Sequence, residues 1–187
     1  MTNNLMEEAG TELGSLSGSG LMFHGTAKRF DAVKASPSKR FGDGRIDWQG
    51  TAIFAAIDSR VALHYTANRG TGFFTGIDLR SLTDADRPIV FGISGGASLK
   101  EAMTKLYGDP ARPETCRGYI YLLDKSKFLH EPGLGIMEMI TRDPSANIGR
   151  LTINRRAAID ELVRDGSVLL DWIPRLEAGG EPADFAV

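Results

Sequence analysis

Short apolar runs separated by polar, turn-forming segments are the feature that most constrains the fold of this chain. Such runs suit buried or half-buried strands, because helices in globular proteins are longer. The predicted strands cover residues 21–23, 52–56, 88–93, 119–123, 137–141 and 167–173, and helical spacing is found at 59–68, 99–107 and from 154 or 155 to 163. The helices are few and do not alternate regularly with the strands. We therefore expect an α+β fold with a mixed or antiparallel sheet.

Capping residues mark the beginnings of two predicted helices. Asp58 is a suitable N-cap for the helix over 59–68, and Ser98 with Glu101 forms a capping box for the helix over 99–107. Residues 27–49 are polar and rich in Lys, Arg, Gly and Asp. This stretch is predicted to be a long loop that contains at most one short helix.

The length of 187 residues suits one domain with a substantial core. Residues 1–20 end in a Ser/Gly run and are predicted to be a flexible lead-in, with a short helix over 4–13 as the alternative. Residues 21–176 form the expected domain. Residues 177–187 contain Gly179, Gly180 and Pro182 and are predicted to be a loose tail.

The charge balance gives no general attraction to nucleic acid, since 22 basic residues stand against 24 acidic ones and the net charge is -2. Cys116 is the only cysteine, which suits a reducing compartment. We find no secretory signal and no apolar run that approaches the ~20 residues of a membrane span. The sequence therefore predicts a soluble, cytoplasmic protein without a membrane partner.

One motif suggests a serine hydrolase. Gly92–Gly96 (GISGG) fits G-x-S-x-G and places Ser94 between a predicted strand and a predicted helix. The acid and the histidine of a triad should follow in later strand–helix units, but the only later histidine, His130, comes just 36 residues on. A glycine-rich turn at the end of a strand explains the motif better.

Metal and phosphate-loop chemistry find no support in the sequence. The three histidines, His24, His64 and His130, are too scattered for a spaced metal motif, and Cys116 adds no partner. No G-x-x-x-x-G-K-[ST] sequence occurs. We expect no metal site.

Three short segments carry a stronger signal when they are taken in order. Phe23–Thr26 (FHGT) ends the first predicted strand. Phe54 lies on a strand, and Tyr65 follows eleven residues later on the next helix. Glu138 lies in the segment 135–141 (GIMEMIT), a predicted strand. This order and spacing resemble the three motifs of ADP-ribosyltransferases of the poly(ADP-ribose) polymerase and diphtheria-toxin-like (H-Y-E) class, over roughly residues 21–155.

The resemblance implies a split α+β fold with two facing small sheets and NAD in the cleft between them. It implies that Glu138 is the catalytic residue and that Tyr65 stacks on the nicotinamide, with Phe54 as the opposing wall. It also implies that the backbone of Gly25 pairs with the carboxamide, while His24 binds the adenosine-side ribose and Thr26 adds a hydroxyl. From charge alone, the basic stretch with Lys39, Arg40 and Arg45 is assigned to the pyrophosphate.

These residue types suit the reaction. Cleavage of the bond between nicotinamide and ribose develops positive charge on the sugar, which a nearby carboxylate such as Glu138 stabilises. The leaving group is a cationic aromatic ring, so stacking on Tyr65 gains a cation–π contribution.

Two positions depart from the family pattern. Phe54 stands where the strand usually has tyrosine, and Ala62 stands where the helix often has a serine that binds the nicotinamide amide. The expected reaction is transfer of ADP-ribose from NAD to a macromolecule, with protein as the expected acceptor and residues 70–87 as its contact. NAD hydrolysis, a catalytically silent NAD-fold module and a serine hydrolase using Ser94 are the alternatives. The small size resembles phage or bacterial effectors and toxins.

Overall fold

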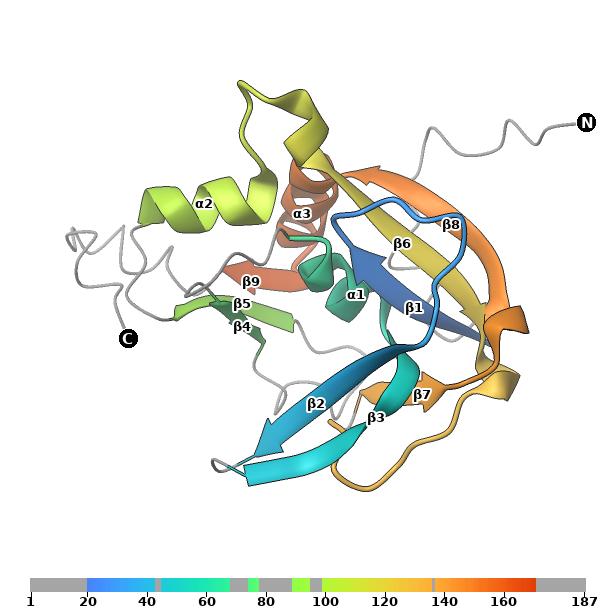
Figure 1. Ribbon diagram of the computed structural model, residues 1–187. Helices are drawn as coiled ribbons and strands as arrows, with labels where there is room; N and C mark the ends of the chain where they lie inside the picture. Colours follow the sequence, from blue (N-terminus) through green and yellow to red (C-terminus); the bar gives the residue numbers. More distant parts are fainter. Residues whose placement is uncertain are drawn as a thin grey trace, which may run out of the picture.

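Two β-sheets of unequal size organise the protein (Figure 1). The computed structural model describes residues 20–42, 45–67, 74–77, 89–94, 99–135 and 137–170. The larger, six-stranded sheet has the order β2-β3-β1-β6-β8, with β7 paired to β3, and the smaller sheet has the order β4-β5-β9. All strand pairs among these residues are antiparallel except β5 with β9. The predicted α+β class with a mixed or antiparallel sheet is confirmed.

The strands of the larger sheet are β1 (Leu21–Thr26), β2 (Ser36–Gly42), β3 (Arg45–Ala56), β6 (Arg117–Asp124), β7 (Glu138–Thr141) and β8 (Asn147–Asn154). The smaller sheet contains β4 (Phe74–Ile77), β5 (Ile89–Ser94) and β9 (Val168–Leu170). The described helices are α1 (Ser59–Tyr65), α2 (Leu99–Tyr107) and α3 (Arg155–Arg164), with 3₁₀ turns at Pro113–Cys116, Lys125–Lys127 and Pro144–Ala146. None of these helices is long and apolar enough to cross a bilayer.

Most elements that were predicted from apolar runs are present. The predicted N-cap Asp58 accepts a hydrogen bond from the backbone N–H of Arg60, and Asn154 caps α3 in the same way. The helix over 99–107 has the predicted bounds, while its predicted cap Ser98 lies outside the described residues. The helix expected over 59–68 is shorter and ends at Tyr65, where the side chain of Thr66 donates to the carbonyl of Leu63.

The prediction of a long loop over residues 27–49 is wrong. This stretch contains β2 and the first part of β3, which pair in seven registers from Ser36↔Ala52 to Gly42↔Arg45. Its polar composition reflects exposure: Arg45, Ile46 and Asp47 are all exposed on β3. Trp48 is the one buried side chain among residues 45–50 of β3, so the apolar pattern gave little sign of this hairpin. The strand β8 was also missed, because it lies at the sheet edge and Ile148 and Thr152 are exposed.

The strand β3 bends sharply. Its first part pairs with β2, and its last part, Ile53–Ala56, pairs with β7 and meets β1 at Phe23↔Ala56. Trp48 and Phe54 are six positions apart on β3, a separation of roughly 20 Å in a straight strand. Their ring centroids are nevertheless only 4.9 Å apart. A Cβ on Gly50 would lie 2.9 Å from the Trp48 ring. The indole therefore lies across Gly50 towards Phe54, and this face of β3 is concave.

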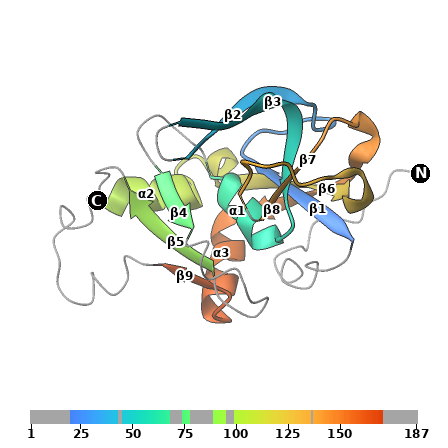
Figure 2. The same ribbon diagram turned by 90° about the horizontal axis from the view of Figure 1, so that it is seen from below.

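Both faces of the central strands are covered. On one side of β1, Phe23 packs into a core shared with α1, α3 and β9. The other side contributes Met22 to a second core with Tyr121 and Val33. Hydrogen bonds hold the segment that follows β1 against this second core. The Tyr121 hydroxyl accepts from the N–H of Phe30 and donates to its carbonyl. The Asn147 side chain likewise accepts from the N–H of Val33 and donates to its carbonyl. Figure 2 shows α1 between the smaller sheet and the strands β1, β6 and β8.

A buried cation ties α3 to the end of α2. Arg155 has 1% exposure, and its Nη1 donates to the carbonyl of Lys105 at 2.6 Å while its Nη2 donates to the carbonyl of Thr115. Burial lowers the pKa of Arg155. The carbonyl of Lys105 belongs to the last turn of α2, where the helix dipole favours a positive charge.

Gly25 to Ala should destabilise the fold, because the new Cβ would lie 1.7 Å from the carbonyl oxygen of Ala62 on α1. The helix and strand must then separate, and we expect a loss of about 1–3 kcal/mol, the usual cost of overpacking. Urea denaturation measures it. The matched control is Gly149→Ala on β8, where the added Cβ would meet Leu122 at an ordinary 3.9 Å. Equal stability of the two variants would contradict the tight contact between β1 and α1.

Candidate functional site

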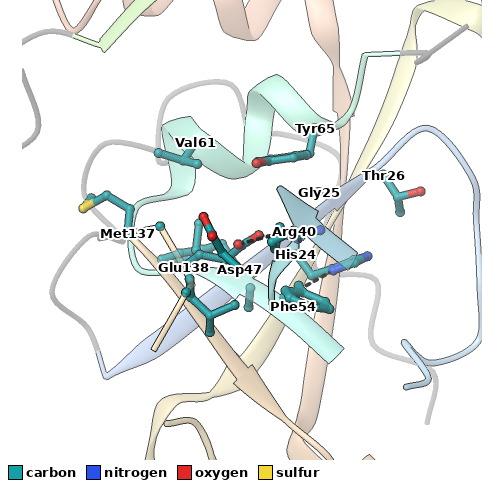
Figure 3. Close-up of a pocket in the computed structure, with 16 residues that line it drawn as sticks. His24, Gly25, Thr26, Arg40, Asp47, Phe54, Val61, Tyr65, Met137 and Glu138 are labelled. Atoms are coloured by element: carbon teal, nitrogen blue, oxygen red, sulfur yellow. Dashed lines mark hydrogen bonds and ion pairs between the residues drawn. The ribbon is translucent and has the colours of Figure 1, made fainter. Parts of the chain in front are cut away.

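A cavity of about 700 Å³ opens where β3 separates from β1 (Figure 3). Its volume is in the range of small-molecule and cofactor sites. The described lining residues come from β1, β2, β3, α1, the segment 133–137 and β7. None of the described side chains of the smaller sheet lines it. The described part of the lining therefore belongs to the larger sheet, to α1 and to the segment that precedes β7.

The cavity brings together seven of the residues predicted for the site. His24, Gly25, Thr26, Arg40, Phe54, Tyr65 and Glu138 all line it. Arg45 does not: it is exposed at the beginning of β3, beside the tip of the β2–β3 hairpin. The residues 70–87 that were predicted to contact an acceptor lie outside the described residues, apart from β4.

Glu138 is paired with Arg40. The Arg40 Nε donates to Oε2 of Glu138 at 2.8 Å, and Nη2 donates to Oε1 of the same carboxylate. The Arg40 side chain is 32% exposed and that of Glu138 18%. The hydrogen bond with Glu138 raises the pKa of Arg40. The two residues come from strands that are not neighbours, β2 and β7, and the bend of β3 between them brings their side chains together.

Phe54 supports this ion pair. The Arg40 guanidinium carbon lies 4.0 Å from the centroid of the Phe54 ring, and Trp48 contacts the same ring edge-on at 86°. One face of Phe54 is therefore covered by a cation. Phe54 also lines the cavity, where it was predicted to form the wall opposite Tyr65, so this prediction concerns the part of the ring that Arg40 does not cover.

Tyr65 is the last residue of α1 and is half-buried at the cavity. Figure 3 shows its ring on the helix side, across from Phe54 and Glu138 on the strand side. Val61, one helical turn earlier, lines the cavity beside it. Ala62 is fully buried against Gly25 and is not among the lining residues.

His24 is held in one tautomer. Its Nδ1 lies 2.6 Å from the carbonyl oxygen of Phe54, and a carbonyl can only accept. The hydrogen of a neutral ring is thus on Nδ1, which leaves Nε2 as an acceptor. Burial lowers the pKa of His24, and the bond to Phe54 opposes this effect only in part. The ring also meets Tyr121 at a centroid distance of 6.4 Å.

The backbone of Gly25 faces the cavity side of β1. Gly20 lies opposite Lys125 at the start of the β1–β6 ladder and accepts a hydrogen bond of 3.2 Å from its N–H. Hydrogen-bonded pairs alternate along an antiparallel ladder, so the even-numbered residues of β1 bond to β6. The odd-numbered residues, which include Gly25, turn their N–H and C=O away from β6. Phe23 meets Ala56 on that side, but the described pairing with β3 ends there. Gly25 therefore offers one donor and one acceptor to a ligand.

Asp47 was not identified from the sequence. It lines the cavity as a second carboxylate, at the irregularity where the β2–β3 register shifts between Arg40 and Phe41. A bulge of this kind redirects side chains and is frequent beside active sites. The polar stretch 27–49 had been predicted as loop, so the residues that face the cavity could not be selected within it.

The segment between β6 and β7 forms a fixed rim. Leu129 and Ile140 exchange two backbone hydrogen bonds of 2.9 Å, which close the base of this segment. The Trp48 indole N–H donates to Glu131 at 2.7 Å, and Arg142 pairs with the other oxygen of that carboxylate at 2.9 Å. Gly133, at positive φ, packs against the Asp47 backbone. The rim is thus attached to β3.

The geometry of the described residues adds no support to the serine-hydrolase alternative or to a metal site. Ser94 ends β5 in the smaller sheet, whereas His24 belongs to the larger sheet and binds the Phe54 carbonyl. His130 is exposed, and residues 95–98 lie outside the described part of the chain. Among the described residues, no group of three or more His, Cys, Asp or Glu side chains is arranged to hold a metal ion.

The cavity combines a charged side, formed by Glu138, Asp47 and Arg40, with an apolar side formed by Val61 and Tyr65. A ligand with an aromatic ring and several hydroxyls matches this division.

No protein-family model matches the chain, and no similar protein was found among curated proteins or solved structures.

The stability of the protein should fall as the pH drops below the ordinary His24 pKa of 6.5. The unfolded chain then takes up a proton that the partly buried ring resists, so the stabilisation present at higher pH is lost. We expect His24→Gln to show a smaller decrease in the free energy of unfolding between about pH 8 and about pH 5.5 than the exposed control His130→Gln. Parallel pH dependence of both variants in urea denaturation would contradict a His24 that stays neutral in the folded protein below this pH.

Proposed function

We propose that this protein is an NAD-consuming ADP-ribosyltransferase with the split α+β fold of that superfamily, and that it transfers ADP-ribose to a macromolecular acceptor, with protein as the expected class. One observation carries the proposal. Residues from three separate motifs, including His24, Tyr65 and Glu138, line one cavity of about 700 Å³. The motifs were selected by residue type, order and spacing in the sequence, so their meeting in space supports the resemblance independently.

The proposed reaction breaks the bond between the nicotinamide nitrogen and C1′ of the ribose. The electron pair of that bond remains on nicotinamide, which leaves as a neutral molecule. The ribose carbon becomes electron-deficient, and the Glu138 carboxylate stabilises the growing positive charge. An acceptor oxygen or nitrogen then forms the new bond to C1′ and loses a proton.

The other cavity residues would orient NAD. Tyr65 provides an aromatic face for the nicotinamide ring, whose positive charge favours stacking. The N–H and C=O of Gly25 match the acceptor and donor of a carboxamide. His24 Nε2 can accept from a ribose hydroxyl, because its other nitrogen is engaged by Phe54. Since the guanidinium of Arg40 is engaged by Glu138, we do not assign it to the pyrophosphate.

NAD hydrolysis is the second candidate, and Asp47 favours it. Glycoside hydrolysis commonly uses two carboxylates, one beside the sugar and one that activates water. Glu138 and Asp47 line the same cavity. If Asp47 activates water, Asp47→Asn should slow nicotinamide release in buffer and leave transfer to an acceptor intact.

Nicotinamide release from NAD tests the proposal, with and without cell lysate. We expect release by the wild-type protein to require lysate and to fall by about 10²–10³-fold in Glu138→Gln, the cost of removing an electrostatic stabiliser of the transition state. Glu114→Gln changes an exposed carboxylate and serves as the control.

Release in buffer alone would establish a glycohydrolase instead. Binding of NAD without release would establish a silent module, and the absence of both would remove the family as a guide. Labelling of Ser94 by a fluorophosphonate would point to the hydrolase alternative.

Tyr65→Ala should weaken NAD binding by about 1–3 kcal/mol, the usual cost of removing an aromatic stacking partner of a base. Titration calorimetry in the Glu138→Gln background measures affinity without consumption of NAD. Tyr65→Phe keeps the ring and should bind nearly as well as the parent. Unchanged affinity of Tyr65→Ala would exclude Tyr65 from the nicotinamide site.

A further inference from the structure

We infer that Arg40 is a positioning residue for Glu138, which acts on the reaction by fixing the plane and location of the catalytic carboxylate. This inference rests on the proposed function and adds to it a residue outside the three motifs. It also replaces the expectation, drawn from charge alone, that Arg40 binds pyrophosphate.

The first support is the geometry of the ion pair. The Arg40 Nε and Nη2 atoms each donate to a different oxygen of Glu138, and Nη1 donates to the Ser38 hydroxyl at 3.1 Å. A planar guanidinium can make this two-pronged contact and thereby fix the carboxylate plane, whereas a lysine ammonium cannot. All three guanidinium nitrogens are engaged, so the fork itself is held in one orientation.

The second support is the packing beneath the guanidinium. Arg40 lies 4.0 Å above the Phe54 ring, the Trp48 ring packs edge-on against Phe54, and the Trp48 N–H donates to Glu131. The ion pair is thus the end of a connected series of contacts that begins at the rim of the cavity. Supporting contacts of this kind hold reactive groups in place before the substrate arrives.

The third support is the register of β2 and β3. Arg40 lies opposite Trp48, so both side chains are on the same face of the ladder, which also bears Phe54 six residues further along β3. On that face the bend of β3 brings Arg40 to Glu138 at the beginning of β7. Figure 3 shows Arg40 and Glu138 meeting within the cavity.

The contact leaves the carboxylate usable. Each carboxylate oxygen has two acceptor positions, so a single bond from Arg40 to each oxygen leaves one position on each for a ribose hydroxyl. The bond to Glu138 raises the pKa of Arg40, so the guanidinium stays charged under working conditions. A carboxylate without this partner would sample several rotamers, and a misplacement of about 1 Å can cost roughly 100-fold in rate.

The test compares Arg40→Met, Arg40→Lys and Arg40→Ala with the wild type in NAD binding and nicotinamide release. We expect Arg40→Met to lower kcat by about 10- to 100-fold and to leave the Kd for NAD nearly unchanged. Arg40→Lys should remain impaired, because it keeps the charge and loses the fork. Guanidinium ion, well below denaturing concentration, should partly restore kcat of Arg40→Ala, whereas sodium chloride of equal ionic strength should not.

Two controls separate positioning from general stability. Arg112→Met removes an arginine that is 64% exposed and pairs at the surface with Asp109, and it should leave kcat unchanged. In the Glu138→Gln background, Arg40→Met should cause little further loss, because a residue that acts through Glu138 has nothing left to position.

Other outcomes overturn the inference. If Arg40→Met raises the Kd for NAD and leaves kcat unchanged, Arg40 contacts NAD directly. If Arg40→Met raises kcat, Arg40 restrains Glu138. Equal losses in the wild-type and Glu138→Gln backgrounds would indicate a structural role only. A wild type that releases no nicotinamide overturns the proposed function and this inference with it. An active wild type with an equally active Arg40→Met overturns the inference alone.

Discussion

The bend of β3 is the constraint on which the site depends. A regular strand would place Arg40 and Glu138 far apart, since they lie opposite Trp48 and Ala56, which are eight positions apart on β3. The bend folds Trp48 across Gly50 onto Phe54 and makes one face of the strand concave. Arg40, Phe54 and Glu138 then meet on that concave face. A Cβ on Gly50 would lie 2.9 Å from the Trp48 ring, so the absence of a side chain at this position allows the indole to lie against the strand.

The ion pair at the site is better understood as a geometric device than as a source of stability. Arg40 is about one-third exposed, and screened pairs of this kind add little to the free energy of folding. Their directional effect is larger, because two parallel hydrogen bonds fix a carboxylate plane that would otherwise rotate. The same principle applies to His24, where one bond to the Phe54 carbonyl selects the tautomer and leaves the other nitrogen to accept. Both groups are oriented by β3, so the strand that shapes the cavity also prepares its polar atoms.

The sequence predicted much of the site but little of the support around it. His24, Gly25 and Tyr65 lie at the ends of a strand and a helix, where period and capping can be recognised, and their order with Glu138 suggested a common site. The position of Asp47 in the cavity and the ion pair of Arg40 with Glu138 were not predicted, because both depend on an irregular hairpin of mostly polar residues. Phe54 lines the cavity, where the sequence predicted it, but its packing against Arg40 was not predicted. Arg45 was selected for its charge and lies outside the cavity lining.

The sequence by itself determined the α+β class and most strand and helix positions, because local periodicity and capping are encoded by adjacent residues. The ordered set of residues that suggested an NAD reaction came from the resemblance to ADP-ribosyltransferases. The tertiary structure decided that the polar stretch 27–49 contains strands, that the cavity lies in the larger sheet, and that Glu138 is held by Arg40. These outcomes depend on contacts between residues 98 positions apart in the chain, and no local pattern records how sharply a strand bends between them.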